Sequence, residues 1–477
     1  MSDKFGKDLT VGSIPRHLLN FSIPMLIGNV LQTGYQIVNT IWLGNTVGPD
    51  AVGATAVSFN IIFILIAVAS GATMATTILV SQYYGAKDYA MVEKVVGNSF
   101  SVTLILGAVL TVIGVLISDF VLRLMNTPAE IFGMASSYLK ISMAAFLIIY
   151  LSNLIISILR GIGDTKTPLI FMVIGVVINA LLDPLLIVGL GPFPRMGLNG
   201  AAYASLIAQV IATAAALIYL NRKGHIVAFS LKKLILNGPL TFLMFKIGFP
   251  TIIQQSLVSI GGAFVTTFVN AFGAPSIAAF GAASRIDSLA FMPAMSLGMA
   301  SSALTGQNLG ARKPERVKEI FKWGIVMTCS ITLVISALAI AIPRLLLSMF
   351  VQDPVVLDIG VHYLRIVGGS YVLFAIMFVT NGIINGSGRT FVTMAFTLIS
   401  LWAIRVPLSA LLSRTGLKIT GIWIAIVASF AVTTAISLIY YSTGKWKVSV
   451  INKRGPMPSG GEGSPAIQPD PEPGGTV

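Results

Sequence analysis

The chain has 477 residues, of which 55% are hydrophobic and only 10% are charged, and its mean hydropathy is +0.88. Soluble globular chains carry about 25% charged residues, so this composition excludes a soluble enzyme and predicts a polytopic membrane protein. The net charge of +14 does not indicate a nucleic-acid partner, because an excess of Lys and Arg in a membrane chain reflects topology.

Twelve apolar runs of membrane-spanning length follow one another along the chain, separated by Gly, Pro and charged residues. They cover residues 16–42, 51–80, 95–121, 133–159, 167–190, 199–221, 246–272, 277–305, 322–346, 359–384, 391–412 and 419–441. This pattern predicts an all-α integral membrane fold. Because twelve is an even number, both termini are expected on the same side of the membrane.

The basic residues predict which side that is. Of the 31 Lys and Arg residues, 22 fall in the N-terminal segment, in the loops after the even-numbered spans and in the segment after Tyr441. Only seven fall in the opposite loops. Since loops on the cytoplasmic side carry the excess of Lys and Arg, we expect both termini in the cytoplasm.

The chain also repeats itself, with an offset of 225 residues. The matching pairs are Gln82 and Gln307, Gly85 and Gly310, Gly161 and Gly386, Gly163 and Gly388, and Thr165 and Thr390. An internal repeat of this length predicts two six-span lobes that run in parallel around a central cleft, which is a transporter architecture. The alternative is a duplicated bundle without a transport role.

The repeat also predicts the domain organisation. We expect an N-lobe over 16–221 and a C-lobe over 246–441, with a cytoplasmic loop between them over 222–245. Residues 1–15 and 442–477 are expected to be cytoplasmic, and the Pro- and Gly-rich stretch from 455 is expected to be a disordered tail.

Asp183 lies inside an apolar run, where a carboxylate is costly and therefore suggests a function. Asn179 lies four residues earlier on the same helix face, and Pro184 leaves a backbone carbonyl without its helical donor. These oxygen atoms suit a proton or a sodium ion; the alternative is a carboxylate satisfied by hydroxyl groups beside a kink. The corresponding stretch of the second half, 402–407, has no acidic residue, so we expect ion coupling in the first half.

Other polar residues within the spans, and a methionine with a flexible, polarizable side chain, predict a substrate cavity. The alternative for them is hydrogen bonding or packing between helices. The cavity candidates are Gln32, Gln36, Gln254, Gln255, Met292, Asp287 and Arg285. Uncharged amide side chains suit varied, often cationic amphiphiles. Asp287 lies two residues from Arg285, so the two side chains are expected to point in different directions. For Asp287, structural pairing and a role in substrate or ion handling both remain open.

The sequence contains no zinc-ligand spacing, phosphate-binding loop, nucleophile triad or pair of catalytic carboxylates. We therefore expect neither an enzyme nor an ATP-driven pump. No cofactor is expected, and no metal beyond a possible sodium ion at Asp183 and Asn179.

Four motifs together resemble the multidrug and toxic compound extrusion (MATE) family, and within it the prokaryotic DinF-like branch. They are Gly-Gln-Asn-Leu-Gly-Ala at 306–311, Arg-Gly-Ile-Gly-Asp-Thr-Lys-Thr-Pro at 160–168, Asn179 with Asp183 and Pro184, and Arg-Ile-Asp-Ser-Leu-Ala-Phe-Met-Pro at 285–293. The resemblance implies two six-helix lobes and the export of organic cations or drugs in exchange for protons or sodium ions. A flippase for a lipid-linked or other amphiphilic substrate is the alternative function.

The resemblance also implies roles for individual residues. The implied ion-coupling set is Asp183, Asn179, Asn153, Ser205, Tyr35 and the Asn39 position, and Pro24 is the implied bending proline of the first span. The family commonly has an aspartate where this chain has Asn39, and an amide cannot take up a proton in the working pH range. The coupling site is therefore expected to hold one carboxylate. We also expect the protein to be a monomer in the cytoplasmic membrane of a prokaryote, with no nucleic-acid partner.

Overall fold

The computed structural model describes residues 6–223 and 227–451. Most of these residues are helical, and no β-strand occurs within the two ranges. The predicted disordered tail from 455, together with residues 1–5 and 224–226, lies outside the described residues. The all-α fold predicted from the sequence is confirmed.

The N-lobe contains six long helices. They are α1 (Ile14–Thr46), α2 (Pro49–Gly85), α3 (Tyr89–Leu124), α4 (Ala129–Gly161), α5 (Lys166–Pro184) and α6 (Leu198–Arg222). Helix α5 continues as a π-helix over Leu185–Gly189. Local sequence sets several helix ends: the Asp88 side chain caps α3 by accepting a hydrogen bond from the Met91 amide at 3.0 Å. Beyond α4 the backbone turns at Gly163, whose φ of 87° favours glycine.

The C-lobe repeats this order with more interruptions. Its helices are α7 (Gly238–Asn270), α8 (Ala274–Gly310), α9 (Pro314–Ala341), α10 (Pro343–Ser348), α11 (Pro354–Val367), α12 (Tyr371–Gly386), α13 (Thr390–Thr397), α14 (Val406–Leu412) and α15 (Ile419–Ser442). A 3-10 turn at Gly368–Ser370 joins α11 to α12, and a π-helix over Leu398–Arg405 joins α13 to α14. Each of these pairs therefore forms one span.

Within the described residues, 11 helices are long and apolar enough to cross a membrane. Helix α1 is not among them although it has 33 residues, because its asparagine and glutamine residues lower its hydropathy. With α1 the spans number twelve, as predicted. Helix α7 begins at Gly238, before the predicted start at 246, because the Asn237 side chain caps it there by accepting from the Leu240 amide at 3.0 Å.

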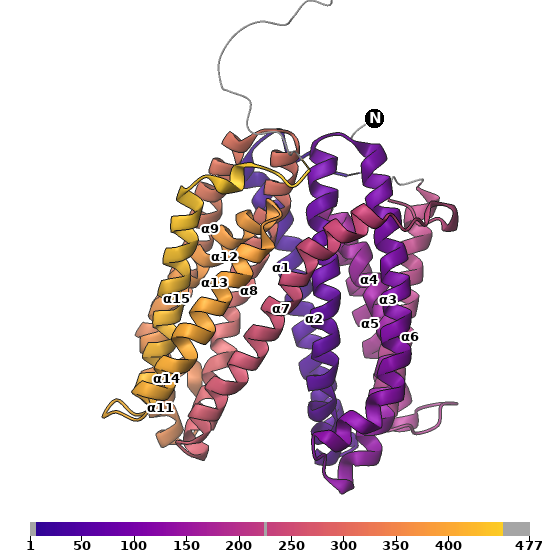
Figure 1. The fold of residues 1–477 in the computed structure, drawn as a ribbon. Helices are drawn as coiled ribbons and strands as arrows, with labels where there is room; N and C mark the ends of the chain where they lie inside the picture. The colour runs from indigo at the N-terminus through magenta and orange to yellow at the C-terminus, as the bar shows by residue number, and fades with distance from the viewer. Residues whose placement is uncertain (1–5, 224–226, 452–477) are drawn as a thin grey trace, which may run out of the picture.

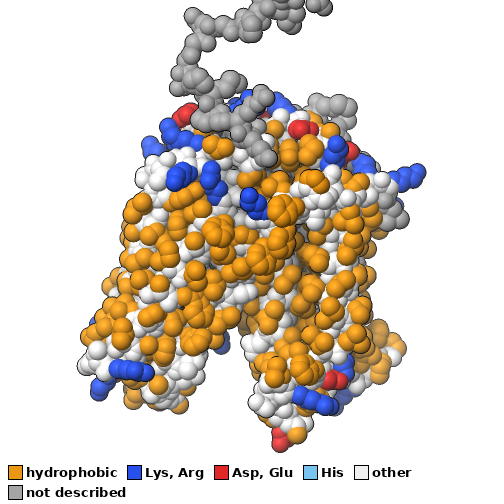
Figure 2. All heavy atoms as spheres, viewed as in Figure 1, with side chains coloured by type: hydrophobic (Ala, Val, Ile, Leu, Met, Phe, Trp, Pro, Cys, Tyr) orange, Lys and Arg blue, Asp and Glu red, His pale blue; other side chains and the backbone are white. Residues whose placement is uncertain are grey.

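The two lobes stand side by side and meet at only one end (Figure 1). This end, here called the termini end, carries the start of α1 and the end of α15. Helices α1 and α2 of the N-lobe contact α7, α8 and α9 of the C-lobe. At the other end, here called the open end, the lobes diverge and the molecular surface is hollowed between them (Figure 2). The predicted arrangement of two repeated lobes is confirmed.

Lys and Arg side chains gather at the termini end on the face shown in Figure 2, whereas the flanks of both lobes are largely hydrophobic. Large apolar side chains such as Leu116 (75% exposed) and Phe120 (67%) of α3 are exposed. Exposure of large apolar residues on this scale suits contact with lipid rather than with water.

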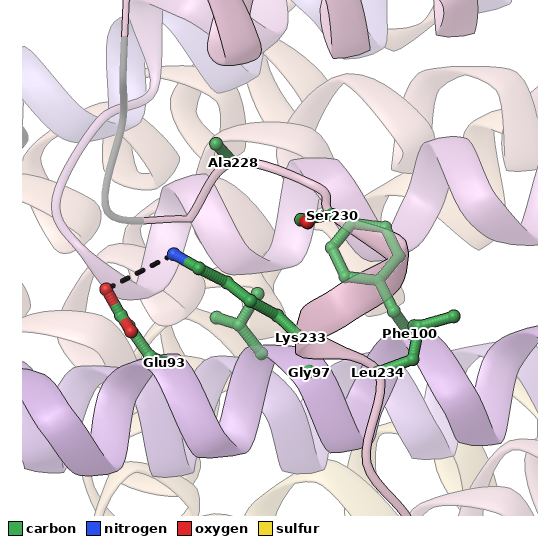
Figure 3. A pocket seen from close by; sticks show the side chains of 8 residues that line it. Glu93, Gly97, Phe100, Ala228, Ser230, Lys233 and Leu234 are labelled. Atoms are coloured by element: carbon green, nitrogen blue, oxygen red, sulfur yellow. Dashed lines mark hydrogen bonds and ion pairs between the residues drawn. The ribbon is translucent and has the colours of Figure 1, made fainter.

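The part of the connection between the lobes that the structure describes, residues 227–237, contacts α3. Lys233 pairs with Glu93 of α3 at 3.4 Å (Figure 3), and the rings of Phe229 and Phe100 lie 5.0 Å apart. The side-chain oxygen of Asn98 accepts hydrogen bonds from the Asn237 amide at 2.8 Å and from Thr241 at 3.1 Å. The start of the C-lobe is thereby attached to the N-lobe.

Candidate functional site

Asp183 lies at the end of α5 and is 1% exposed. Its Oδ1 accepts a hydrogen bond from the Asn179 side-chain amide at 3.1 Å, as expected for residues one helical turn apart. Its Oδ2 accepts from the Tyr35 hydroxyl of α1, also at 3.1 Å. Two neutral donors from two helices therefore hold the carboxylate.

The hydrogen bonds extend from Asp183 in both directions. On α1, the Asn39 amide donates to the Tyr35 hydroxyl oxygen at 2.8 Å. On α6, the Ser205 hydroxyl donates to the Asn179 carbonyl oxygen at 3.2 Å. The result is one series of hydrogen bonds, Asn39–Tyr35–Asp183–Asn179–Ser205, here called the N-lobe relay. It joins α1, α5 and α6.

The relay contains five of the six residues of the implied coupling set. The sixth, Asn153 on α4, is half-buried and makes no hydrogen bond to the relay. Pro24 is buried inside α1, between Tyr35 and the start of the helix at the termini end. The geometry thus joins side chains that lie up to 148 residues apart in sequence.

No Lys or Arg side chain pairs with Asp183 among the described residues. A buried carboxylate without a counter-ion is costly, and binding a proton or a monovalent cation removes that cost. The relay offers carboxylate, amide and hydroxyl oxygens for this purpose, and the Asn39 side-chain oxygen is buried without a hydrogen-bond partner. No group of three or more His, Cys, Asp and Glu side chains that would hold a transition metal occurs in the described part of the chain.

The backbone next to the relay departs from an α-helix. Pro184 lies inside α5 and the π-helix Leu185–Gly189 follows it directly. In the C-lobe, a π-helix over Leu398–Arg405 lies before the corresponding proline, Pro407, rather than after it. Insertions of this kind are frequent at functional sites. The prolines were visible in the sequence, but the π-helices were not.

The corresponding region of the C-lobe carries a cation. Arg405 donates from Nε to the Ser429 hydroxyl at 2.7 Å, and its guanidinium lies 4.7 Å from the centre of the Phe430 ring. In these corresponding regions, the N-lobe therefore carries an acid and the C-lobe a base.

Asp287 lies in the core of the C-lobe and is 6% exposed. The hydroxyl groups of Tyr363 and Tyr371 donate to its two oxygens, each at 2.5 Å. Arg285 is exposed instead, with its guanidinium 5.7 Å from the Phe350 ring centre, so the two side chains do diverge. Sequence reasoning did not identify the two tyrosines, because nothing in their local sequence marks them as partners of Asp287.

The remaining cavity candidates are placed as follows. Gln32 and Gln36 are exposed on α1, while Gln255 and Met292 are half-buried on α7 and α8. Gln254 donates from Nε2 to the Thr397 hydroxyl at 2.9 Å, which links α7 to α13 within the C-lobe. These residues do not form one hydrogen-bonded cluster.

Three comparisons place the chain among known proteins. The MatE family model matches residues 24–185 and again 250–411, which reproduces the internal repeat. A "Probable multidrug resistance protein YoeA" of Bacillus subtilis is 33% identical over 445 residues, covering 92% of this chain and 96% of the relative. A "Probable multidrug resistance protein NorM" of Thermotoga maritima is 27% identical over 448 residues, covering 93% and 96%.

Among solved structures, one titled "Outward-facing conformation of a multidrug resistance MATE family transporter of the MOP superfamily" matches with a TM-score of 0.85. It is 25% identical, and the match covers 92% of this chain and 97% of that one. The similarity therefore extends over both lobes.

Proposed function

This chain belongs to the MatE family of membrane transporters, and on that premise we propose that it is a secondary antiporter that exports organic cations or other amphiphilic drugs. Protons or sodium ions move inward in exchange. The observation that carries this proposal is Asp183, a buried carboxylate held by neutral donors and without a counter-ion. A site of this kind changes its net charge when it binds an ion. How fully it is occupied from each side of the membrane therefore depends on the ion gradient.

The route by which ion binding would affect the lobes runs along α1. Tyr35 connects the C-terminal part of this helix to Asp183. The N-terminal part, with Leu18 and Phe21, packs in one hydrophobic cluster with Leu297 and Leu304 of α8 in the other lobe. Pro24 lies between the two parts and removes a backbone donor there. Loading Asp183 with an ion would thus alter the hydrogen bonds of α1 on one side of Pro24 and the lobe contact on the other.

The hollow between the lobes supplies the substrate path in this proposal (Figure 2). The open end corresponds to one access state, and the second state would open the termini end. The bias of Lys and Arg toward the termini end supports placing that end in the cytoplasm and the protein in the cytoplasmic membrane. The state described here then faces outward.

Reconstitution of the purified protein alone into proteoliposomes tests the proposal. We expect a proton gradient or a sodium gradient imposed across the membrane to drive ethidium in the opposite direction, and external ethidium to stimulate release of the same ion. Entry of ethidium without counter-movement of either ion would indicate a channel, and the absence of any ion-driven flux from a monodisperse sample would reject the antiporter.

Asn39 provides a separate prediction about ion number. In the relay its amide donates to Tyr35 and its carbonyl oxygen is buried and unpaired, so Asn39→Asp adds a second carboxylate at the far side of the tyrosine. We expect the variant to exchange more ions per substrate molecule than the parent, measured as the ratio of ion release to ethidium uptake. An unchanged ratio would show that this position lies outside the coupling site.

A further inference from the structure

The lobes are joined at the termini end by two glutamines that the internal repeat relates to each other. The amide of Gln82 on α2 donates to the Gly386 carbonyl of the C-lobe at 2.9 Å. The amide of Gln307 on α8 donates to the Gly161 carbonyl of the N-lobe at 3.0 Å. The two donor residues lie 225 residues apart, and so do the two acceptor residues. The internal repeat therefore relates one bond to the other. Both glutamines are 0% exposed.

Two glycines allow the backbones to approach closely beside these bonds. A Cβ atom on Gly85 would overlap the backbone carbonyl of Gln307, and a Cβ atom on Gly310 would overlap that of Gln82. Neither overlap can be relieved by rotating a side chain, because the opposing atoms belong to the backbone. The helices α2 and α8 therefore touch through their main chains at this point, which only glycine permits.

An N-terminal strap, residues 6–13, reinforces one of the two bonds. Its Leu9 amide donates to the Gln307 side-chain oxygen at 3.0 Å, and its Leu9 carbonyl accepts from Asn308 at 3.2 Å. The same strap reaches the N-lobe, where the Lys7 amide donates to the Ile162 carbonyl at 2.9 Å. The side-chain oxygen of Gln82 has no hydrogen-bond partner among the described residues. The two glutamines therefore differ, because only Gln307 is also bonded to the strap.

We propose that Gln82, Gln307, Gly85 and Gly310 form an interlobe lock that keeps the termini end closed. Separating the lobes breaks both side-chain bonds together, since each glutamine belongs to one lobe and its acceptor to the other. The buried amides and carbonyls stay paired only while the end is closed. The lock therefore favours the state that is open at the opposite end, and its opening is the step that admits substrate from the termini end. Only this last assignment rests on the proposed function.

Each leucine substitution removes the hydrogen bond that one glutamine amide makes to the other lobe. A net hydrogen-bond contribution corresponds to roughly a fivefold change in an equilibrium constant. We therefore expect Gln82→Leu or Gln307→Leu to raise the population that is open at the termini end by about that factor. Gln352→Leu is the matched control, because the Gln352 amide also donates to a backbone carbonyl, at 2.9 Å, but within one lobe and at the protein surface.

Distances between spin labels measure this population without any transport assay. Cys329, the single cysteine of the chain, is replaced by serine, and labels are attached at Lys94→Cys on α3 and Glu319→Cys on α9. Both positions are exposed near the termini end, one on each lobe. Molecules that are open at the termini end have a longer distance between the two labels, and we call their fraction the long-distance population. We expect this population to grow in either leucine variant and to stay constant in the Gln352→Leu control.

Gly85→Ala and Gly310→Ala provide a second pair of variants that leaves both glutamines in place. Each methyl group inserts between the lobes, so we expect the same growth of the long-distance population. Unchanged distance distributions in the leucine and alanine variants, relative to the control, would overturn the lock. The readout does not depend on drug or ion flux, so an inactive antiporter with a functioning lock is distinguished from an active one without it.

Discussion

Asp183→Asn is expected to abolish ion-driven drug transport while leaving the protein folded. The amide side chain occupies the same space and keeps the contact with Asn179, but it cannot take up a proton and carries no charge for a sodium ion. Exchange of one proton for one ethidium cation moves no net charge, so a gradient of one pH unit supports roughly a tenfold ethidium gradient. A membrane potential of about 100 mV would add to the driving force only for an uncharged substrate. In the variant we expect this accumulation to disappear, measured as ethidium uptake into proteoliposomes under an imposed gradient.

The matched control is Asp119→Asn. Asp119 lies in the same lobe and receives hydrogen bonds from Ser136 at 2.5 Å and Lys140 at 2.7 Å, but it belongs to a partly exposed ion pair outside the relay. Transport by this variant is expected to equal that of the parent. Full ion-driven uptake by the Asp183→Asn protein would remove the coupling role from Asp183, and ethidium binding retained without uptake would support it.

Asp287→Ala is expected to destabilise the C-lobe strongly. Removing the carboxylate leaves the hydroxyl groups of Tyr363 and Tyr371 in a buried, aromatic environment without an acceptor. Two buried hydroxyl donors left without an acceptor, at about 1–3 kcal/mol each, correspond to about 2–6 kcal/mol. We expect a lower midpoint of thermal unfolding in detergent, followed by intrinsic fluorescence.

Asp358→Ala is the control for this substitution, because Asp358 forms a surface ion pair with Arg344 at 3.4 Å with side chains 70% and 63% exposed. Exposed pairs of this kind contribute about 0–1 kcal/mol, so the midpoint is expected to change little. Equal midpoints for the two alanine variants would show that the cluster around Asp287 does not stabilise the lobe. The burial of the Asp287 carboxylate would then have to be explained by a role in substrate or ion handling.

Much of the fold could be predicted because it depends on local or repeated signals. The spans follow from the hydropathy of segments long enough to cross the bilayer. The two lobes follow from residues such as Gln82 and Gln307, which recur at one offset. The contact between Asn179 and Asp183 follows from the helix itself, since residues four apart share a face. None of these inferences needs information about which helix packs against which.

The partners of the buried polar groups could not be predicted in the same way. Nearly all positions of a membrane helix are apolar, so hydrophobic periodicity does not show which face points into the lobe. That Tyr35 reaches Asp183, and that Asp287 is held by Tyr363 and Tyr371, depends on the rotation and packing of helices distant in sequence.

By itself, then, the sequence determined the number of spans, the duplication, and Asp183 as an acid that has no counterpart at the corresponding place in the other lobe, because hydropathy, repeats and charge are properties of the chain. Only the tertiary structure decided which lobe end is closed and by which atoms. Gln82 and Gly386 lie 304 residues apart, and their bond exists because the two lobes meet at one end and diverge at the other.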